Sequence, residues 1–131
     1  MLFRSSQPAG RSFNDNMDLD KLEKVQMSTA RKFSFSVLEA GQGALMSKFD
    51  MVDAYKIVPA SVDDYNLQGF SWLGKFFVET RQIFGAKTSV ANYDILANTV
   101  ATVSKVGLDI PERFFHRALD DTPVVAPASK T

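Results

Sequence analysis

Residues 66–79 are typical of two strands that double back on each other. Aromatic and β-branched side chains lie on both sides of Leu73–Gly74, and a two-residue connection with glycine favours a hairpin. The predicted strands are Asn66–Trp72 and Lys75–Glu79. Because a hairpin pairs its strands in opposite directions, it predicts an antiparallel sheet rather than a parallel one.

Two helices are predicted from caps and apolar spacing. Ser28 is the expected N-cap of a helix that ends near Ala40, and Gly41 is its stop. Ser89 is the expected N-cap of a longer helix that ends near Val106. The apolar stripe predicted for this second helix consists of Tyr93, Leu96, Val100 and Val103.

Three further strands are expected at Leu45–Met51, Phe114–Leu119 and Pro123–Val125. Helices and strands without regular alternation predict an α+β fold, with helices packed on one face of an antiparallel sheet. The expected organisation is a polar N-terminal segment at 1–18, a folded core at 19–125 and a disordered tail at 126–131. His116 is expected on the surface of a strand.

Composition excludes several function classes. Fifteen basic and fifteen acidic residues cancel, so the chain has no overall electrostatic preference for nucleic acid. The absence of cysteine excludes disulfides, thiolate zinc sites and cysteine nucleophiles. No apolar run approaches the ~20 residues of a membrane span, and the first residues have no apolar signal core. We therefore expect no membrane partner and an intracellular protein, either cytoplasmic or nuclear.

Asp120 and Asp121 are adjacent carboxylates at a predicted turn, and Asp50 lies near the end of another predicted strand. If those strands are neighbours, the carboxylates converge, and carboxylate oxygens suit Mg²⁺ or Mn²⁺. Two such ions ~3.5–4 Å apart can activate a hydroxyl and stabilise a leaving oxygen. The alternative is a solvated turn, because aspartate pairs are common there and the chain has another at Asp63–Asp64.

Three motifs in order resemble those of reverse transcriptases. SKFDMVDAYKIVPASVDD, residues 47–64, resembles the first catalytic motif, in which a strand ends in aspartate before Ala-Tyr. Residues 67–98 resemble the hairpin and second motif, including Phe84–Gly85. ALDD, residues 118–121, resembles the Tyr-x-Asp-Asp box. Residues 3–18 and 41–50 resemble the DIRS, tyrosine-recombinase type of retrotransposon, and the resemblance extends to Val125.

The resemblance implies a partial polymerase palm, a fragment of an RNA-directed DNA polymerase. Its partners would be an RNA template, a DNA primer and a deoxynucleoside triphosphate, and its cofactors two Mg²⁺ or Mn²⁺ ions. The implied catalytic metal ligands are Asp50, Asp120 and Asp121. The implied nucleotide and template contacts are Met51 through its carbonyl, Tyr55 under the incoming sugar, Gln82, Phe84 and Gly85. Tyr55 is equally compatible with an aromatic core residue beside Pro59. For Gly85 the alternative is a plain turn glycine.

The chain also departs from the family pattern. Ala118 replaces the tyrosine of the box, which affects primer positioning more than metal binding. The fingers residues that hold the triphosphate and the thumb are expected to be missing from the chain, so enzymatic activity is uncertain and the isolated chain is expected to be inactive. The alternative is a non-catalytic, retroelement-derived interaction or structural protein. A calcium-binding module is disfavoured because no loop has the required spacing of oxygen ligands.

Overall fold

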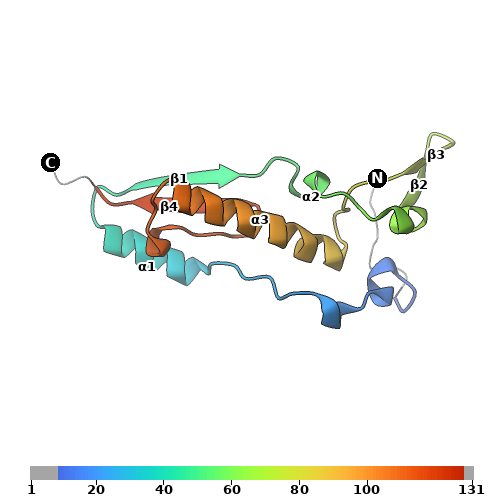
Figure 1. Cartoon of the computed structure of the whole chain (residues 1–131), viewed down its shortest axis with the longest axis horizontal. Helices are drawn as coiled ribbons and strands as arrows, with labels where there is room; N and C mark the ends of the chain where they lie inside the picture. Colours follow the sequence, from blue (N-terminus) through green and yellow to red (C-terminus); the bar gives the residue numbers. More distant parts are fainter. Residues whose placement is uncertain (1–8, 129–131) are drawn as a thin grey trace. The chain divides into compact units, whose positions relative to one another are not determined.

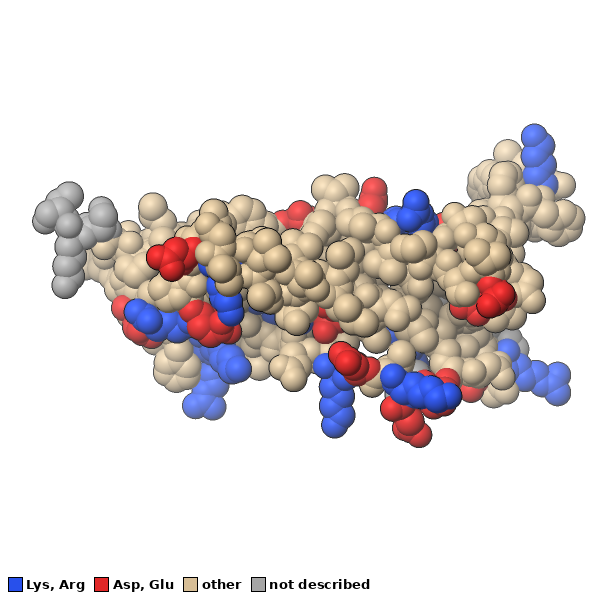
Figure 2. All heavy atoms as spheres, viewed as in Figure 1, with Lys and Arg blue, Asp and Glu red and all other residues tan. Residues whose placement is uncertain are grey.

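The computed structural model describes residues 9–128 of the chain (Figure 1). Basic and acidic side chains are interspersed on the face drawn in Figure 2. These residues form two compact units: a first unit of residues 9–24 and 53–93, and a second unit of residues 25–52 and 94–128. Helices and antiparallel strands occur together, so the α+β class is confirmed. Within the described residues the strands form two separate two-stranded sheets, β1–β4 and β2–β3. The prediction of a single sheet is therefore wrong.

The second unit is built around the antiparallel pair of β1 (Leu45–Asp50) and β4 (Asp121–Ala126), which lie side by side in Figure 1. The pairing runs in register from Leu45 opposite Ala126 to Asp50 opposite Asp121. Val125 of β4 is fully buried. Because the two strands are far apart in sequence, this pairing brings the chain's middle and its C-terminal region to one sheet.

Helix α1 (Ala30–Ala40) packs against β4 in the second unit. Its N-cap is Thr29, whose side chain accepts a hydrogen bond from the backbone N–H of Lys32. The predicted cap, Ser28, is one residue too early because its hydroxyl accepts the backbone N–H of Arg117 instead. Gly41 ends the helix as predicted, with the positive φ of 80° that glycine tolerates.

The first unit contains the hairpin of β2 (Gly69–Trp72) and β3 (Lys75–Val78). Leu73 and Gly74 both have positive φ, 49° and 72°, which is the pattern of a type I′ turn. The hairpin prediction is confirmed, with shorter strands than expected. The remaining elements of this unit are η1 (Phe13–Asn16), η2 (Leu19–Lys21), α2 (Ala54–Ile57) and η3 (Val62–Leu67).

Helix α3 (Lys87–Gly107) begins two residues before its predicted cap. Ser89 is buried inside the first turns, where its hydroxyl donates to Oε1 of Gln82 at 3.0 Å. The predicted apolar stripe is only partly right, because Tyr93 is buried but Val100 and Val103 are exposed. Alanines occupy the other buried positions of this helix, at 91, 97 and 101. No helix in the described part of the chain is long and apolar enough to span a membrane.

The strand predicted at Phe114–Leu119 is wrong. The segment starts as a 3-10 turn, η4 (Glu112–Phe114), because the N–H of Phe115 donates to the carbonyl of Glu112. It then meets β4 only through isolated bridges, Phe115 with Val124 and Ala118 with Asp121. Local turn formation therefore replaces a continuous ladder upstream of the aspartates.

Candidate functional site

The carboxylates of Asp50 and Asp121 lie where β1 ends and β4 begins. Asp50 is the direct partner of Asp121 across the antiparallel pair, and directly opposed residues project to the same face of a sheet. Asp120 belongs to the tight turn that precedes β4. Ala118 and Asp121 close this turn with reciprocal backbone hydrogen bonds of 2.8 and 3.1 Å. Backbone register thus fixes two of the three aspartates opposite each other and the third beside them.

Met51 is joined to the same turn. It follows β1 directly, and its N–H donates to the carbonyl of Asp120 at 3.2 Å. This bond extends the β1–β4 pairing past Asp50, so the residue expected to contribute a metal-directed carbonyl is held beside Asp120.

Lys48 supplies the positive charge nearest to these aspartates. Its Nζ lies 2.8 Å from Oδ1 of Asp121, and both side chains are partly exposed, 57% and 39%. The hydrogen bond and charge of Asp121, followed by the charges of Asp50 and Asp120, raise the pKa of Lys48. The Lys48 ammonium therefore neutralises part of the negative charge of Asp50, Asp120 and Asp121, which together are called the acidic cluster.

The donor chemistry of the cluster suits a hard divalent ion, because all three side chains offer carboxylate oxygens. The side chains are not arranged as a ligand set, however: residues 9–128 contain no group of three or more acidic, histidine or cysteine side chains that could hold a metal. That Asp50, Asp120 and Asp121 bind one ion together therefore stays a prediction. The backbone register places Asp50 opposite Asp121, whereas the side chain of Asp121 is paired with Lys48.

Tyr55 lies in an aromatic cluster of the first unit. Its ring makes edge-to-face contacts with Phe84, at a centroid distance of 4.9 Å, and with Tyr93, at 5.5 Å. Tyr93 is fully buried and Phe84 is exposed. The cluster therefore connects the core to the surface, and Tyr55 and Phe84, two predicted site residues, are in direct contact.

The turn at Gly85 is held by a side chain that the sequence did not single out. Asn14 is buried; its Nδ2 donates to the carbonyl of Gly85 at 2.8 Å and its Oδ1 accepts the N–H of Lys87 at 3.0 Å. Gly85 has a φ of 89°, which side chains with a Cβ rarely adopt. The turn thus needs glycine for its backbone and Asn14 for its polar groups.

Gln82 is a second polar anchor of this segment. Its amide nitrogen donates to the carbonyl of Pro59 at 3.3 Å, and its Oε1 accepts the hydroxyl of Ser89. Gln82 therefore ties the chain after α2 to the start of α3. Because its side-chain amide makes both of these hydrogen bonds, Gln82 has a structural role in the first unit.

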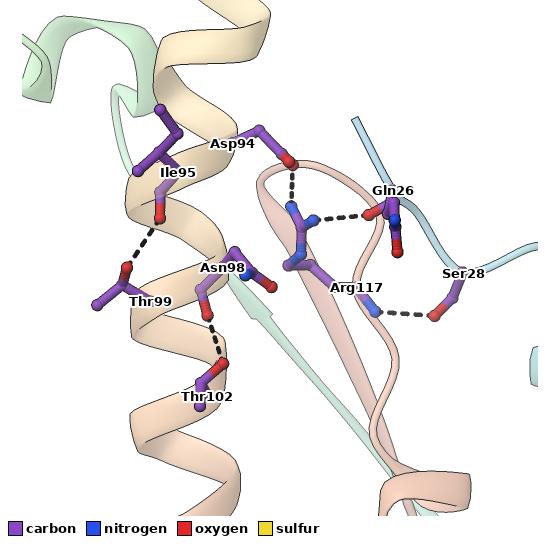
Figure 3. Close-up of polar contacts among 8 residues, drawn as sticks. All are labelled: Gln26, Ser28, Asp94, Ile95, Asn98, Thr99, Thr102 and Arg117. Atoms are coloured by element: carbon purple, nitrogen blue, oxygen red, sulfur yellow. Dashed lines mark hydrogen bonds and ion pairs between the residues drawn. The ribbon is translucent and has the colours of Figure 1, made fainter. Parts of the chain in front are cut away.

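Sequence reasoning also missed a buried ion pair in the second unit (Figure 3). Arg117 contacts Asp94 at 2.5 Å and donates to the carbonyl of Gln26 at 2.6 Å. The two charged side chains are only 10% and 17% exposed. Nothing in the local sequence around either residue marks them as partners, because they lie on different elements.

His116 is buried, contrary to the prediction of a surface position. Its Nε2 lies 2.7 Å from the hydroxyl of Ser36, and its ring makes a T-shaped contact with the ring of Phe33. Burial, which disfavours the charged imidazolium, lowers the pKa of His116. The backbone carbonyl of Arg113 acts in the opposite direction on that pKa.

Comparisons with known proteins identify no family for this chain. No family model matches the chain, and no curated protein matches it. One solved structure that is similar is the crystal structure of the native prototype foamy virus protease–reverse transcriptase. The similarity has a TM-score of 0.47 and 24% sequence identity, and it covers 60% of this chain and 10% of that chain.

Proposed function

We propose that this chain is a catalytic-core segment of an RNA-directed DNA polymerase and that it contributes the carboxylates for nucleotidyl transfer. The observation that carries the proposal is the pairing of Asp50 with Asp121, with Asp120 in the adjoining turn. Three motifs in the expected order along the sequence support the same assignment. The DIRS type of retrotransposon is the proposed origin.

The proposed ligands of Mg²⁺ or Mn²⁺ are Asp50, Asp120 and Asp121, with the carbonyl of Met51 beside them. When bound, such ions activate a primer hydroxyl and neutralise the charge of a triphosphate. Lys48 pairs with Asp121. Because exposed ion pairs are weak and screened by salt, Lys48 is able to release Asp121 to a divalent ion.

The remaining proposed roles fall on the first unit. The Tyr55 ring, supported edge-on by Phe84 and Tyr93, is the proposed surface under the incoming sugar. Gly85 lacks a side chain, so a template or nucleotide can approach its backbone closely. Asn14 and Gln82 keep that turn in place. The proposed partners are an RNA template, a DNA primer and a deoxynucleoside triphosphate.

A non-catalytic, retroelement-derived interaction or structural protein is the second candidate. The observation in its favour is the Lys48–Asp121 pair, in which a lysine ammonium neutralises one of the aspartates. In that case the acidic cluster would bind divalent ions no better than other exposed aspartates of the chain.

Mn²⁺ titration separates the two candidates. Because Mn²⁺ broadens nearby amide resonances, we expect selective broadening at residues 48–51 and 119–122, strengthened by a deoxynucleoside triphosphate. Asp50→Asn and Asp120→Asn should each remove it, whereas Asp63→Asn, in an exposed 3-10 turn of the first unit, should not. Broadening that is equal at all exposed aspartates, or that survives Asp50→Asn, would contradict the polymerase assignment.

A further inference from the structure

A polar hollow of about 220 Å³ lies within the second unit, away from the residues assigned to the proposed function. It is bounded by residues 26–28, the first turn of α1, the C-terminal half of α3, and η4 with the segment that follows it. Figure 3 shows its Arg117 side, with Asn98 and Thr102 on α3 and with Gln26, Ser28 and Arg117 across from them.

One wall of the hollow is fixed by Arg117. Its guanidinium is held between Asp94 and the carbonyl of Gln26, and its backbone N–H donates to the Ser28 hydroxyl oxygen at 3.3 Å. These three bonds leave the arginine little freedom to move. The Ser28 oxygen acts as an acceptor in this arrangement, so its own proton remains available to a ligand.

Two lysines bring further positive charge to the hollow. Lys32 comes from α1 and Lys105 from the last turns of α3. Lys105 pairs with Glu112, whose side chain is largely exposed, and such a partner can turn away at little cost. Among the described residues, Lys32 has no acidic partner within ion-pair distance.

The charge balance and the donors favour an anion. Three cationic side chains, those of Lys32, Lys105 and Arg117, face the single lining carboxylate of Glu112. With Asp94 behind Arg117, the balance is one positive charge, 3 − 2 = 1. The Asn98 amide and the Ser28 hydroxyl add neutral donors from two different elements. Donors that converge from several directions match a tetrahedral group with several strong acceptor oxygens.

We propose that this hollow is a binding site for a phosphate dianion, either inorganic phosphate or the phosphate group of a small phosphomonoester. Lys32 and Lys105 supply the charge, Ser28 and Asn98 supply neutral hydrogen bonds, and Arg117 shapes the wall. On binding, Lys105 exchanges Glu112 for the phosphate oxygen. The site does not depend on the polymerase assignment, because none of its residues belongs to the acidic cluster.

The test is an NMR titration of the ¹⁵N-labelled chain with inorganic phosphate, and separately with glycerol 3-phosphate, at constant ionic strength. Saturable shifts are expected at the amides of Ser28, Lys32, Asn98 and Lys105. Because an exposed ion pair contributes up to about 1 kcal/mol, Lys32→Gln is expected to raise the Kd about fivefold. Lys105→Gln should raise it more, since it also leaves Glu112 facing the ligand.

The matched control is Lys21→Gln, which removes an exposed lysine of the first unit and should leave the Kd unchanged. A response to glycerol 3-phosphate but not to inorganic phosphate would identify the phosphomonoester as the ligand, and the reverse would identify the free ion. Equal shifts with sodium chloride at the same ionic strength would overturn the proposal. So would an equal loss of affinity in Lys32→Gln and Lys21→Gln.

Discussion

Two ion pairs of the second unit have similar lengths but different surroundings. Arg117 and Asp94 are 2.5 Å apart and almost enclosed, whereas Lys48 and Asp121 are 2.8 Å apart and half exposed. An enclosed charge that loses its partner has no water to replace it, whereas an exposed charge does. Burial rather than distance therefore decides which pair stabilises the fold and which aspartate is free to exchange its partner.

The largest expected effect comes from breaking the enclosed pair. Arg117→Met leaves the carboxylate of Asp94 and the carbonyl of Gln26 without their donor, so we expect a loss of about 3–5 kcal/mol in the free energy of unfolding. Urea denaturation measures this loss. Adding Asp94→Leu to the variant should restore part of it, because the unpaired charge is then removed. A loss below about 1 kcal/mol in the single variant would show that water reaches Asp94.

A smaller effect on the free energy of unfolding is expected from the protonation of His116. This buried titratable group is neutral rather than paired with a charge. Its lowered pKa means that the unfolded chain takes up a proton at a higher pH than the folded chain does. Stability should therefore be full above the ordinary histidine pKa of about 6.5 and fall as the pH drops below it. Urea denaturation between pH 7 and pH 5 measures this slope.

His116→Phe provides the comparison for that slope. The variant cannot titrate, so its stability should depend less on pH over the same window, even if Ser36 loses a partner and the variant is less stable throughout. Parallel curves for the two proteins would show that His116 does not produce the pH dependence.

The smallest effect on stability is expected at the exposed pair. Lys48→Gln should leave the midpoint of urea denaturation nearly unchanged, because water solvates Asp121 in place of the ammonium. The same change should strengthen Mn²⁺ binding at the acidic cluster, since a competing cation is gone. Weaker Mn²⁺ binding in Lys48→Gln would mean that the lysine organises the cluster rather than competes for it.

The features predicted best from the sequence are those that depend on a few neighbouring residues. The turn at Leu73–Gly74 and the stop at Gly41 follow from local backbone preferences, and both are found. The strand expected at Phe114–Leu119 was wrong because a 3-10 turn competes locally with the ladder. Val103 was placed in an apolar stripe but is exposed, since the periodicity of a helix does not say which of its apolar faces is covered.

The candidate site was predictable to a different extent. The motifs pointed to Asp50 and Asp121, and the register pairs them, but the Lys48 contact depends on side-chain rotamers that no motif specifies. Asn14 holds Gly85 across 71 residues of sequence, and Arg117 meets Asp94 across 23. Such contacts arise only when the elements pack, so a single sequence carries no sign of them.

The β2–β3 hairpin has a practical consequence for handling this protein in solution. Within residues 9–128, β2 and β3 pair only with each other, and edge strands of this kind are where the strand of another chain can add. Phe76 is 91% exposed, and Lys75 is the only charged residue between Phe70 and Val78. That lysine acts as a gatekeeper against edge-to-edge aggregation. High salt screens its repulsion, so concentrated samples should stay clear longest in buffers of low ionic strength.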